Sequence, residues 1–336
     1  MDAFINNLLI DLSLLPLFAV FVVSLYVLSR GADILIDNAV ILSIRWGIPK
    51  IIVGATIVSL GTTLPEATVS VFAAMKGNPD LALGNAVGSI IANTGLIVGI
   101  AAMLGELPVD QKTINRQGVI QLYSGVLLVI ISLPIFSQSP FGTLHQWMGW
   151  VLTGMLVVYI YFSIRWSKLG IDPTEVTPKP SRREPFKKQI FLLILGMVMV
   201  ILASKVLIPT VEISAIRLGI PQGIIAATLV AFGTSLPELI TAITAVRKGH
   251  GELAVGNIIG ADILNVLFVV GLSAAVTKGG LPVPLEFYKL QFPTMILILV
   301  LFRIFAKSKD HRISKKEGLL LASLYFIYLL LSFFWL

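Results

Sequence analysis

The chain has 336 residues, of which 56% are hydrophobic and 13% are charged, and it contains no cysteine. Soluble domains carry roughly 25% charged residues, and the apolar residues here lie in long runs, so the composition excludes a soluble enzyme, a disordered chain and a disulfide scaffold. A membrane β-barrel is also excluded, because its strands would alternate apolar and polar residues.

Ten apolar segments follow one another along the chain, and we expect an all-α integral membrane protein with ten transmembrane helices. A helix needs about 20 apolar residues to cross the hydrocarbon core, and backbone exposed to lipid must satisfy its own hydrogen bonds. The first and sixth segments are longer than a perpendicular span and should tilt. The segments cover residues 8–44, 49–76, 80–104, 118–136, 145–166, 189–217, 221–247, 252–276, 288–307 and 317–336.

Basic residues set the expected orientation in a cell inner or plasma membrane. Residues 167–188 are rich in Lys and Arg and are predicted to form a cytoplasmic linker between a first repeat, residues 1–166, and a second, residues 189–336. An even number of helices then places both termini on the extracytoplasmic side. Basic cytoplasmic loops also explain the net charge of +7, so we expect a lipid bilayer and no nucleic acid as partner.

The two halves of the chain share two motifs in the same order. Residues 61–66 read Gly-Thr-Thr-Leu-Pro-Glu and residues 233–238 read Gly-Thr-Ser-Leu-Pro-Glu. Further on, residues 84–88 read Gly-Asn-Ala-Val-Gly and residues 256–260 read Gly-Asn-Ile-Ile-Gly. Because each half has five helices, an odd number, the second copy must be inverted. Two inverted five-helix repeats with broken core helices are typical of alternating-access transporters with a site near the midplane.

The first motif predicts a cation site. Gly61 and Pro65 interrupt the second helix and free backbone carbonyls, which at this depth are tolerated only where they line a cavity. Glu66 follows the break, and it would repel its counterpart Glu238 unless a cation lay between them. A helix-capping role for each glutamate is the alternative, but charge inside a membrane is costly and is most often functional. Hydroxyl and carbonyl oxygens would come from Thr62, Thr63, Thr234 and Ser235.

An all-oxygen ligand set of this kind suits a hard cation such as Ca²⁺ or Na⁺, not Zn²⁺ or Cu²⁺. The third helix adds polar residues on one face, which would serve either as ligands or as hydrogen-bonding contacts between closely packed helices. These are Asn85, Ser89 and Asn93, with the counterparts Asn257, Ala261 and Asn265. For Asp262, next to Ala261, three roles stay open: ion ligand, support for a ligand, or proton carrier.

Other polar residues need no transport role. Arg30, Asp33 and Asp37 share one face of the first helix, and we expect an intrahelical ion pair there. The three histidines lie in predicted loops.

With these paired motifs, the chain resembles the cation/calcium antiporter superfamily, and most closely its prokaryotic sodium/calcium exchanger type. Residues 29–33, Ser-Arg-Gly-Ala-Asp, resemble the first-helix signature of that family. The resemblance implies a core made of the second, third, seventh and eighth helices, across which the long first and sixth helices slide. It also implies a Ca²⁺ site between the two glutamates, flanked by Na⁺ sites.

Carried over to this chain, the resemblance makes Glu66 and Glu238 the central ligands. Thr62 and Thr234 would offer carbonyls, Thr63 and Ser235 hydroxyls, and Ser59 and Ala231 carbonyls to the outer Na⁺ sites. Ser89, Asn93 and Asn265 would complete the shell. The chain departs from the family pattern where Asn265 replaces a common aspartate, Ala261 a serine, and Asp262 a common asparagine. These departures leave H⁺ open as a substitute for Na⁺.

The sequence therefore predicts a secondary antiporter that exchanges Ca²⁺ for Na⁺ by alternating access. A Ca²⁺/H⁺ antiporter is the alternative, and a cation channel fits less well because channels usually build the pore by subunit symmetry. No His-Glu-x-x-His, Gly-x-Ser-x-Gly or Walker sequence is present, so we expect no enzyme. The expected partners are inorganic cations, with no resident cofactor, and the sequence is compatible with a monomer.

Overall fold

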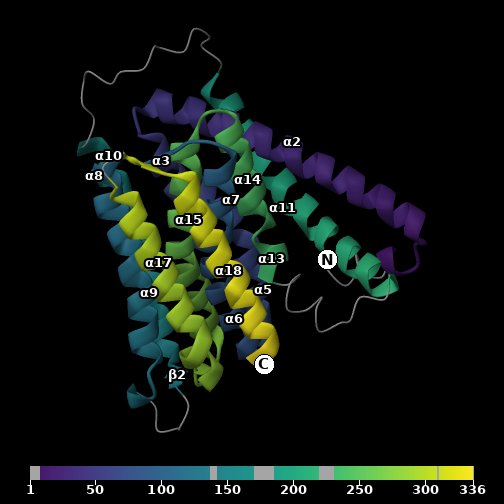
Figure 1. Ribbon diagram of the computed structural model, residues 1–336, viewed down its shortest axis with the longest axis vertical. Helices are drawn as coiled ribbons and strands as arrows, with labels where there is room; N and C mark the ends of the chain where they lie inside the picture. The colour runs from purple at the N-terminus through teal and green to yellow at the C-terminus, as the bar shows by residue number, and fades with distance from the viewer. Residues whose placement is uncertain (1–7, 137–141, 170–184, 219–230, 309, 336) are drawn as a thin grey trace.

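The computed structural model describes residues 8–136, 142–169, 185–218, 231–308 and 310–335, and these are predominantly helical (Figure 1). The first half comprises α2 (Leu14–Trp46), α3 (Lys50–Val53), η1 (Gly54–Val58), α4 (Ser59–Thr62), α5 (Leu64–Met75), α6 (Pro79–Ile91), η2 (Ala92–Ile97), α7 (Val98–Leu104), α8 (Gln111–Thr113), η3 (Ile114–Gly118), α9 (Val119–Ser132), η4 (Pro134–Phe136) and α10 (Gln146–Leu169).

The second half comprises α11 (Phe186–Arg217), α13 (Ala231–Thr234), α14 (Leu236–Arg247), α15 (Gly251–Leu264), η7 (Asn265–Val270), α16 (Gly271–Val276), η8 (Phe287–Gln291), α17 (Phe292–Ala306) and α18 (Lys315–Trp335). Outside the undescribed ranges, the predicted segments and the observed helices agree to within several residues. Part of the predicted segment 221–247 lies outside the described residues.

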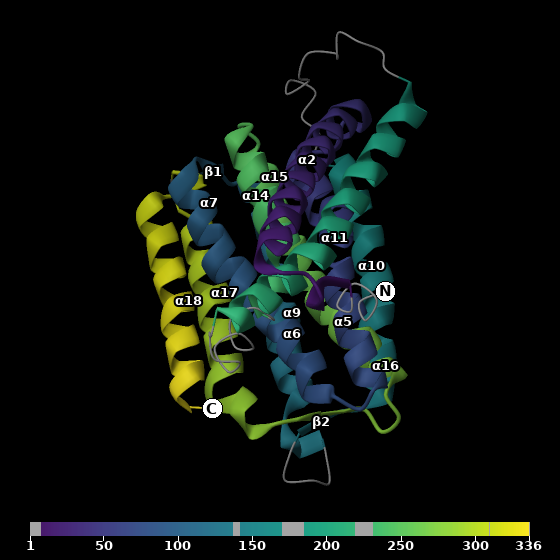
Figure 2. The ribbon, with the colours of Figure 1, turned by 90° about the vertical axis from the view of Figure 1, so that its right-hand side faces the viewer.

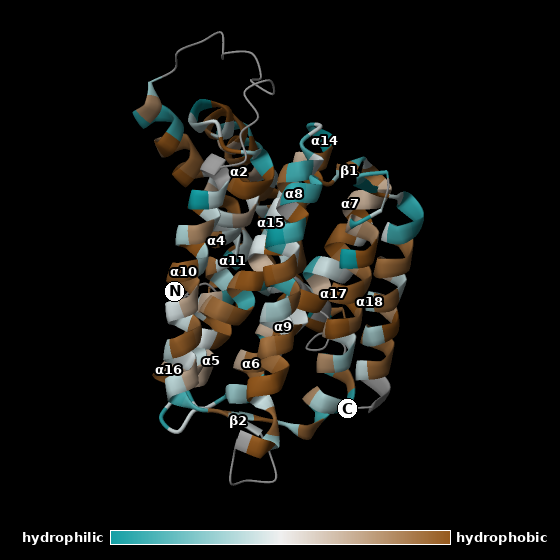
Figure 3. Cartoon of the chain, turned by 90° about the vertical axis from the view of Figure 1, so that its left-hand side faces the viewer, coloured by the Kyte–Doolittle hydropathy of each residue, from teal (hydrophilic) through white to brown (hydrophobic). Residues whose placement is uncertain are grey.

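Length and composition make this chain a multi-pass membrane protein. Seven helices of the described part could cross a membrane, or eight if the pair 50–62 and 64–75, bent by 45°, is one broken span. Figure 3 shows apolar residues along the helices and polar residues gathered at their ends, most densely at the end with α8 and β1.

Two long helices, α2 and α11, pack against each other and lie obliquely across the remaining helices (Figure 1). Their backbones meet at glycines, because a Cβ on Gly196 would lie 2.6 Å from the Leu35 nitrogen and one on Gly31 would lie 2.8 Å from the Met199 Cβ. The oblique course agrees with the tilt expected from their length.

The core is formed by the continuous helices that run from α6 to α7 and from α15 to α16. In the most apolar 18-residue stretch of each helix, 83% and 89% of the residues are buried, against 22% in α2. These two helices are therefore central and α2 is peripheral. The helix α15 crosses η1 closely, since a Cβ on Gly260 would lie 2.3 Å from the Ala55 carbonyl oxygen. In Figure 2, α6 leads up to α7 whereas α15 leads down to α16.

Local features recur at matched places in the two halves. The π-helical turns η2 and η7 each interrupt a core helix, and η3 and η8 each precede the next helix. A π-helical turn in a longer helix frequently marks a functional site.

Four short strands add to the predicted all-α fold. β1 (Leu107–Pro108) pairs antiparallel with β4 (Arg312–Ile313), and β2 (Gly142–Leu144) pairs antiparallel with β3 (Leu281–Val283). The two pairs lie at opposite ends of the molecule (Figure 2). Each pairing satisfies backbone groups of connecting segments that leave the helices, so it is a feature of tertiary contact and not of local sequence.

Candidate ion-binding site

The helix that carries the first glutamate motif is broken where the sequence predicts. α4 ends at Thr62 and α5 begins at Leu64, and because Pro65 has no N–H, the Gly61 carbonyl loses its helical partner. Two backbone hydrogen bonds bridge the break, from the Thr63 amide to the Ser59 carbonyl at 2.9 Å and from the Ala67 amide to the Thr63 carbonyl at 3.0 Å. The equivalent break separates α13 from α14, with Pro237 in the same position.

Glu66 and Glu238 lie in the first turns of α5 and α14, and both are fully buried. Their carboxyl groups are close enough to act directly on each other. Within the described part of the chain, none of their four oxygens accepts a hydrogen bond of normal geometry, although the Thr62 hydroxyl lies beside Glu238. Two adjacent buried carboxyl groups without donors are stable only when a cation or protons neutralise their charge.

Two hydrogen bonds cross between the halves in a reciprocal manner. The Thr234 hydroxyl donates to Oδ1 of Asn85 at 2.9 Å. The equivalent Thr62 hydroxyl lies 3.3 Å from Oδ1 of Asn257. Each threonine therefore joins the break of its own half to the third helix of the other half.

The side-chain amides of Asn85 and Asn257 make further hydrogen bonds within the protein. Nδ2 of Asn85 donates to the Ser70 hydroxyl at 2.9 Å and to the Glu66 carbonyl at 3.3 Å. Nδ2 of Asn257 donates to the Thr241 hydroxyl at 3.2 Å. Of the two roles left open by the sequence, hydrogen bonding between helices is the one that these contacts support for Asn85 and Asn257.

Another contact between the halves has no symmetry-equivalent contact. The Ser235 hydroxyl lies 3.3 Å from the Ser89 hydroxyl, both buried. In the equivalent pair Ala261 replaces the serine, and the buried Thr63 hydroxyl has no hydrogen-bond partner among the described residues.

Asn93 and Asn265 lie at equivalent places, in the first turns of η2 and η7, and both are fully buried. η2 packs against α14 and η7 packs against α5, so each asparagine is on an element that contacts the glutamate helix of the other half. Oδ1 of Asn93 and both polar atoms of Asn265 have no partner in the described structure.

The unpartnered atoms of Thr63, Glu66, Asn93, Glu238 and Asn265 are oxygens, apart from one amide nitrogen. Within the described ranges, no three His, Cys, Asp or Glu side chains are grouped so that they could hold a metal ion. A cation between the two carboxylates would therefore also need hydroxyl, amide or carbonyl oxygens. Hard cations, Ca²⁺ and Na⁺ among them, take such ligands.

Comparison with known families decides the identity of the chain. The model of the family described as "Sodium/calcium exchanger protein" matches residues 16–165 and 188–334. The chain belongs to the sodium/calcium exchanger family. The matched residues include both glutamate motifs, and the resemblance stated from the motifs is confirmed.

Several relatives of this family member match over nearly their whole length. The sodium/calcium exchanger MaX1 of Methanosarcina acetivorans is 29% identical, with 94% of this chain and 98% of the relative covered. The inner membrane protein YrbG of Escherichia coli is 32% identical, with 93% and 95% covered. Among solved structures, the sodium-calcium exchanger NCX_Mj soaked without Na⁺ and Ca²⁺ is 26% identical with a TM-score of 0.79, covering 94% of this chain and 98% of that one.

The resemblance implies two outer ligands, the backbone carbonyls of Ser59 and Ala231. Ser59 is buried, but its carbonyl already accepts from the Thr63 amide at 2.9 Å and lies 3.3 Å from the Thr62 hydroxyl. An ion at that carbonyl would share the oxygen with the Thr63 amide. Ala231 is the first residue of α13, directly after an undescribed range.

Asp262 is buried in this exchanger-family chain and accepts three hydrogen bonds. Its donors are Asn93 at 3.3 Å, Gln121 at 2.7 Å and Thr94. Thr94 and Gln121 were missed by the sequence reasoning. The signal for Gln121 is an uncharged polar residue near the start of an apolar predicted helix, residues 118–136.

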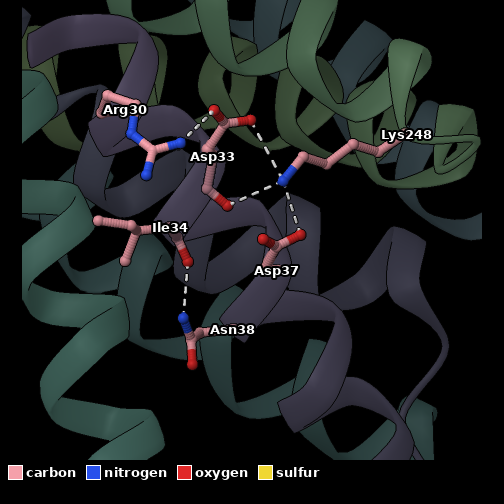
Figure 4. A network of polar contacts seen from close by, with 6 residues as sticks. All are labelled: Arg30, Asp33, Ile34, Asp37, Asn38 and Lys248. Carbon is pink, nitrogen blue, oxygen red and sulfur yellow. Dashed lines mark hydrogen bonds and ion pairs between the residues drawn. The ribbon is translucent and has the colours of Figure 1, made fainter.

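A separate ionic cluster joins α2 to the turn after α14 (Figure 4). Arg30 pairs with Asp33 at 3.8 Å, the intrahelical pair predicted from spacing. Lys248 reaches Asp37 at 2.7 Å and Asp33 at 3.2 Å, a contact that spacing did not predict. Partial burial alone would lower the pKa of Lys248, but the two carboxylates outweigh it and the pKa is raised.

Proposed function

We propose that this protein is a secondary antiporter that exchanges Ca²⁺ for Na⁺ by alternating access. The observation that carries the proposal is the meeting of Glu66 and Glu238, two fully buried carboxylates without hydrogen-bond donors in the described structure. Membership of the sodium/calcium exchanger family supports the identity of both ions.

The architecture that fits this function is ten transmembrane helices in two inverted five-helix repeats, residues 1–166 and 189–336. The opposite directions of the two core helices support the inversion (Figure 2). The matched π-helical turns support it, and so do the strand pairs, since β1 with β4 and β3 with β2 are equivalent contacts at opposite ends. The reciprocal Thr–Asn hydrogen bonds add a further, independent correspondence.

In this proposal the central ligands are Glu66 and Glu238. The Thr63 hydroxyl and the side-chain oxygens of Asn93 and Asn265 complete the ligand set, because they are buried and have no hydrogen-bond partner in the part of the chain that the structure describes. Thr62, Thr234, Ser235 and Ser89 support the site from the breaks and the third helix, and carbonyls at the breaks add further oxygens. Ser59 and Ala231 are the outermost candidates.

Charge neutralisation couples binding to movement. With no ion bound, two carboxylates would have to pass through a low-dielectric barrier, which is costly. Ca²⁺ neutralises both, and Na⁺ ions replace it by competing for the same oxygens. α11 is placed to move over the site, because Met197 packs on Gly61 at one break and Ile208 packs on Gly233 at the other.

The orientation follows from basic residues. The ends of α10 and α17, the start of α18 and the turn after α14 carry many of the Lys and Arg side chains. We assign this end, with the linker 167–188, to the cytoplasm and both termini to the opposite side.

Transport by reconstituted protein tests the proposal. Proteoliposomes loaded with Na⁺ should take up ⁴⁵Ca²⁺ when Na⁺ is diluted outside, and Glu66→Gln and Glu238→Gln should each abolish this uptake. Glu106→Gln is the matched control, because Glu106 is an exposed glutamate in a surface pair with Arg312. Uptake driven by a pH gradient alone would favour H⁺ as the coupling ion, and flux without any counter-ion would favour a channel. Undiminished flux in both site variants would reject the site.

A further inference from the structure

Asp262 is a third buried acidic residue near the site, and it has no counterpart in the first half, where Ile90 holds the equivalent position. Its carboxylate is close enough to Glu238 to act on it electrostatically. No Lys, Arg or His forms an ion pair with Asp262 in the described part of the chain. Three uncharged donors surround it instead.

Those donors come from two other elements. Asn93 and Thr94 belong to η2, and Gln121 belongs to α9. Gln121 also donates to the Thr94 hydroxyl at 3.3 Å. One carboxylate on α15 thus ties η2 and α9 to the core helix of the other half.

The contact with Asn93 fixes which way that amide faces. Oδ1 of Asp262 accepts from Nδ2 of Asn93 at 3.3 Å, so the amide oxygen of Asn93 is turned away from the carboxyl group. Oδ1 of Asn93 is buried and without a partner among the described residues. At the equivalent Asn265, neither amide atom has a partner within the described ranges, and no comparable contact there fixes its orientation.

We propose that Asp262 is a positioning residue, which holds the Asn93 amide so that its carbonyl oxygen is presented to the cation between Glu66 and Glu238. This inference rests on the proposed function. Thr94 and Gln121 hold the carboxylate itself in place. A misdirected amide would present hydrogens to the cation, so fixing the orientation improves binding without any direct contact between Asp262 and the ion.

A double-mutant cycle separates positioning from a simple effect of charge. Asp262→Asn and Asn93→Leu should each raise the Ca²⁺ concentration for half-maximal exchange by about tenfold, the size of one buried hydrogen bond to an ion. The maximal rate of the Asp262→Asn variant should change less than threefold. If Asp262 acts through Asn93, the double variant should be no worse than the more affected single variant. Multiplying effects would overturn the positioning role and leave only a charge effect.

A reversal variant gives a second readout. The double variant Asn93→Asp with Asp262→Asn keeps the total charge. It also keeps the hydrogen bond between the two positions, with the donor now at 262 and the acceptor at 93. The second carboxylate oxygen at position 93 still faces the site. It should restore half-maximal Ca²⁺ to within about threefold of wild type. Gln117→Leu is the matched control, because Gln117 lies one turn from Gln121 and donates to Ser163 instead, at 3.1 Å.

Ca²⁺-dependent thermal stabilisation of the purified full chain keeps the proposal testable when flux is low. Wild type should be stabilised by Ca²⁺, and Asp262→Asn should need about tenfold more Ca²⁺ for the same shift. Wild type that neither binds nor transports Ca²⁺ would reject the proposed function. Wild type that does both, with an unchanged Asp262→Asn variant, would reject this inference alone. If Asp262→Asn does not fold, Gln121→Leu should show a smaller rise in the same direction, and an unchanged value there would count against the proposal.

Discussion

The Thr234 hydroxyl donates a 2.9 Å hydrogen bond to Oδ1 of Asn85, a residue from the other half of the chain. Asn85 in turn donates to the carbonyl of Glu66 at 3.3 Å. A short hydrogen-bonded path therefore leads from the break before Glu238 to the backbone of Glu66. The positions of the two carboxylates are set by contacts between the halves as well as by their own helices.

Replacement of Asn85 by Leu should destabilise the protein by about 1–3 kcal/mol, because it leaves the buried Thr234 and Ser70 hydroxyls without this partner. Thermal unfolding in detergent measures the change. Asn38→Leu is the matched control, because the Asn38 amide makes a single bond to a carbonyl of its own helix, at 2.8 Å. A variant of Asn85 no less stable than the control would contradict the bridging role.

Replacement of Ala261 by Ser should strengthen Na⁺ binding. Position 261 is equivalent to Ser89, which contacts Ser235. Ser235 is in turn equivalent to Thr63, whose hydroxyl has no partner among the described residues. The new hydroxyl would therefore lie where a partner of Thr63 is missing. We expect the Na⁺ concentration for half-maximal Ca²⁺ release to fall by about fivefold, as for one added hydrogen-bonding oxygen. Ser89→Ala should shift it in the opposite direction. Equal Na⁺ dependence in all three proteins would exclude a Na⁺ role for this pair of positions.

Sequence patterns predicted the meeting of Glu66 and Glu238 because both lie in duplicated frames that share one break geometry. The partners of Asp262 could not be predicted in the same way. Thr94 and Gln121 contact it only because η2 and α9 approach α15 in three dimensions, and Ile90 gives no hint from the other copy. The paired strands were missed for the same reason, since they join connecting segments far apart in sequence.

Replacement of Lys248 by Met should speed up the movement of α2 and α11 without changing Ca²⁺ affinity. Lys248 ties the core turn after α14 to Asp33 and Asp37 on α2, so its loss frees the peripheral helix in this conformation (Figure 4). The raised pKa of Lys248 keeps it charged below pH 10.5, so pH will not break the pair in the range used for transport. We expect a higher maximal rate at low salt and a smaller difference at high salt, because partly exposed pairs are screened. Arg312→Met removes a surface pair away from α2 and should leave the rate unchanged.

Acidification should destabilise the protein through His250, which lies in the turn before α15. Partial burial, followed by the charge of Lys50, lowers the pKa of His250 below 6.5, and Nδ1 lies 3.2 Å from Nζ of Lys50. That contact requires Nδ1 to be an unprotonated acceptor. Because the unfolded chain takes up this proton first, the stabilising contribution is complete above about pH 6.5 and is lost as the pH falls through the lower folded value. The other charged groups that face His250 are Glu252, Asp37 and Lys248.

The melting temperature should drop between pH 7.5 and pH 5, and the drop should be smaller in His250→Gln than in wild type or in His311→Gln. An equal drop in all three proteins would show that other groups account for the acid sensitivity.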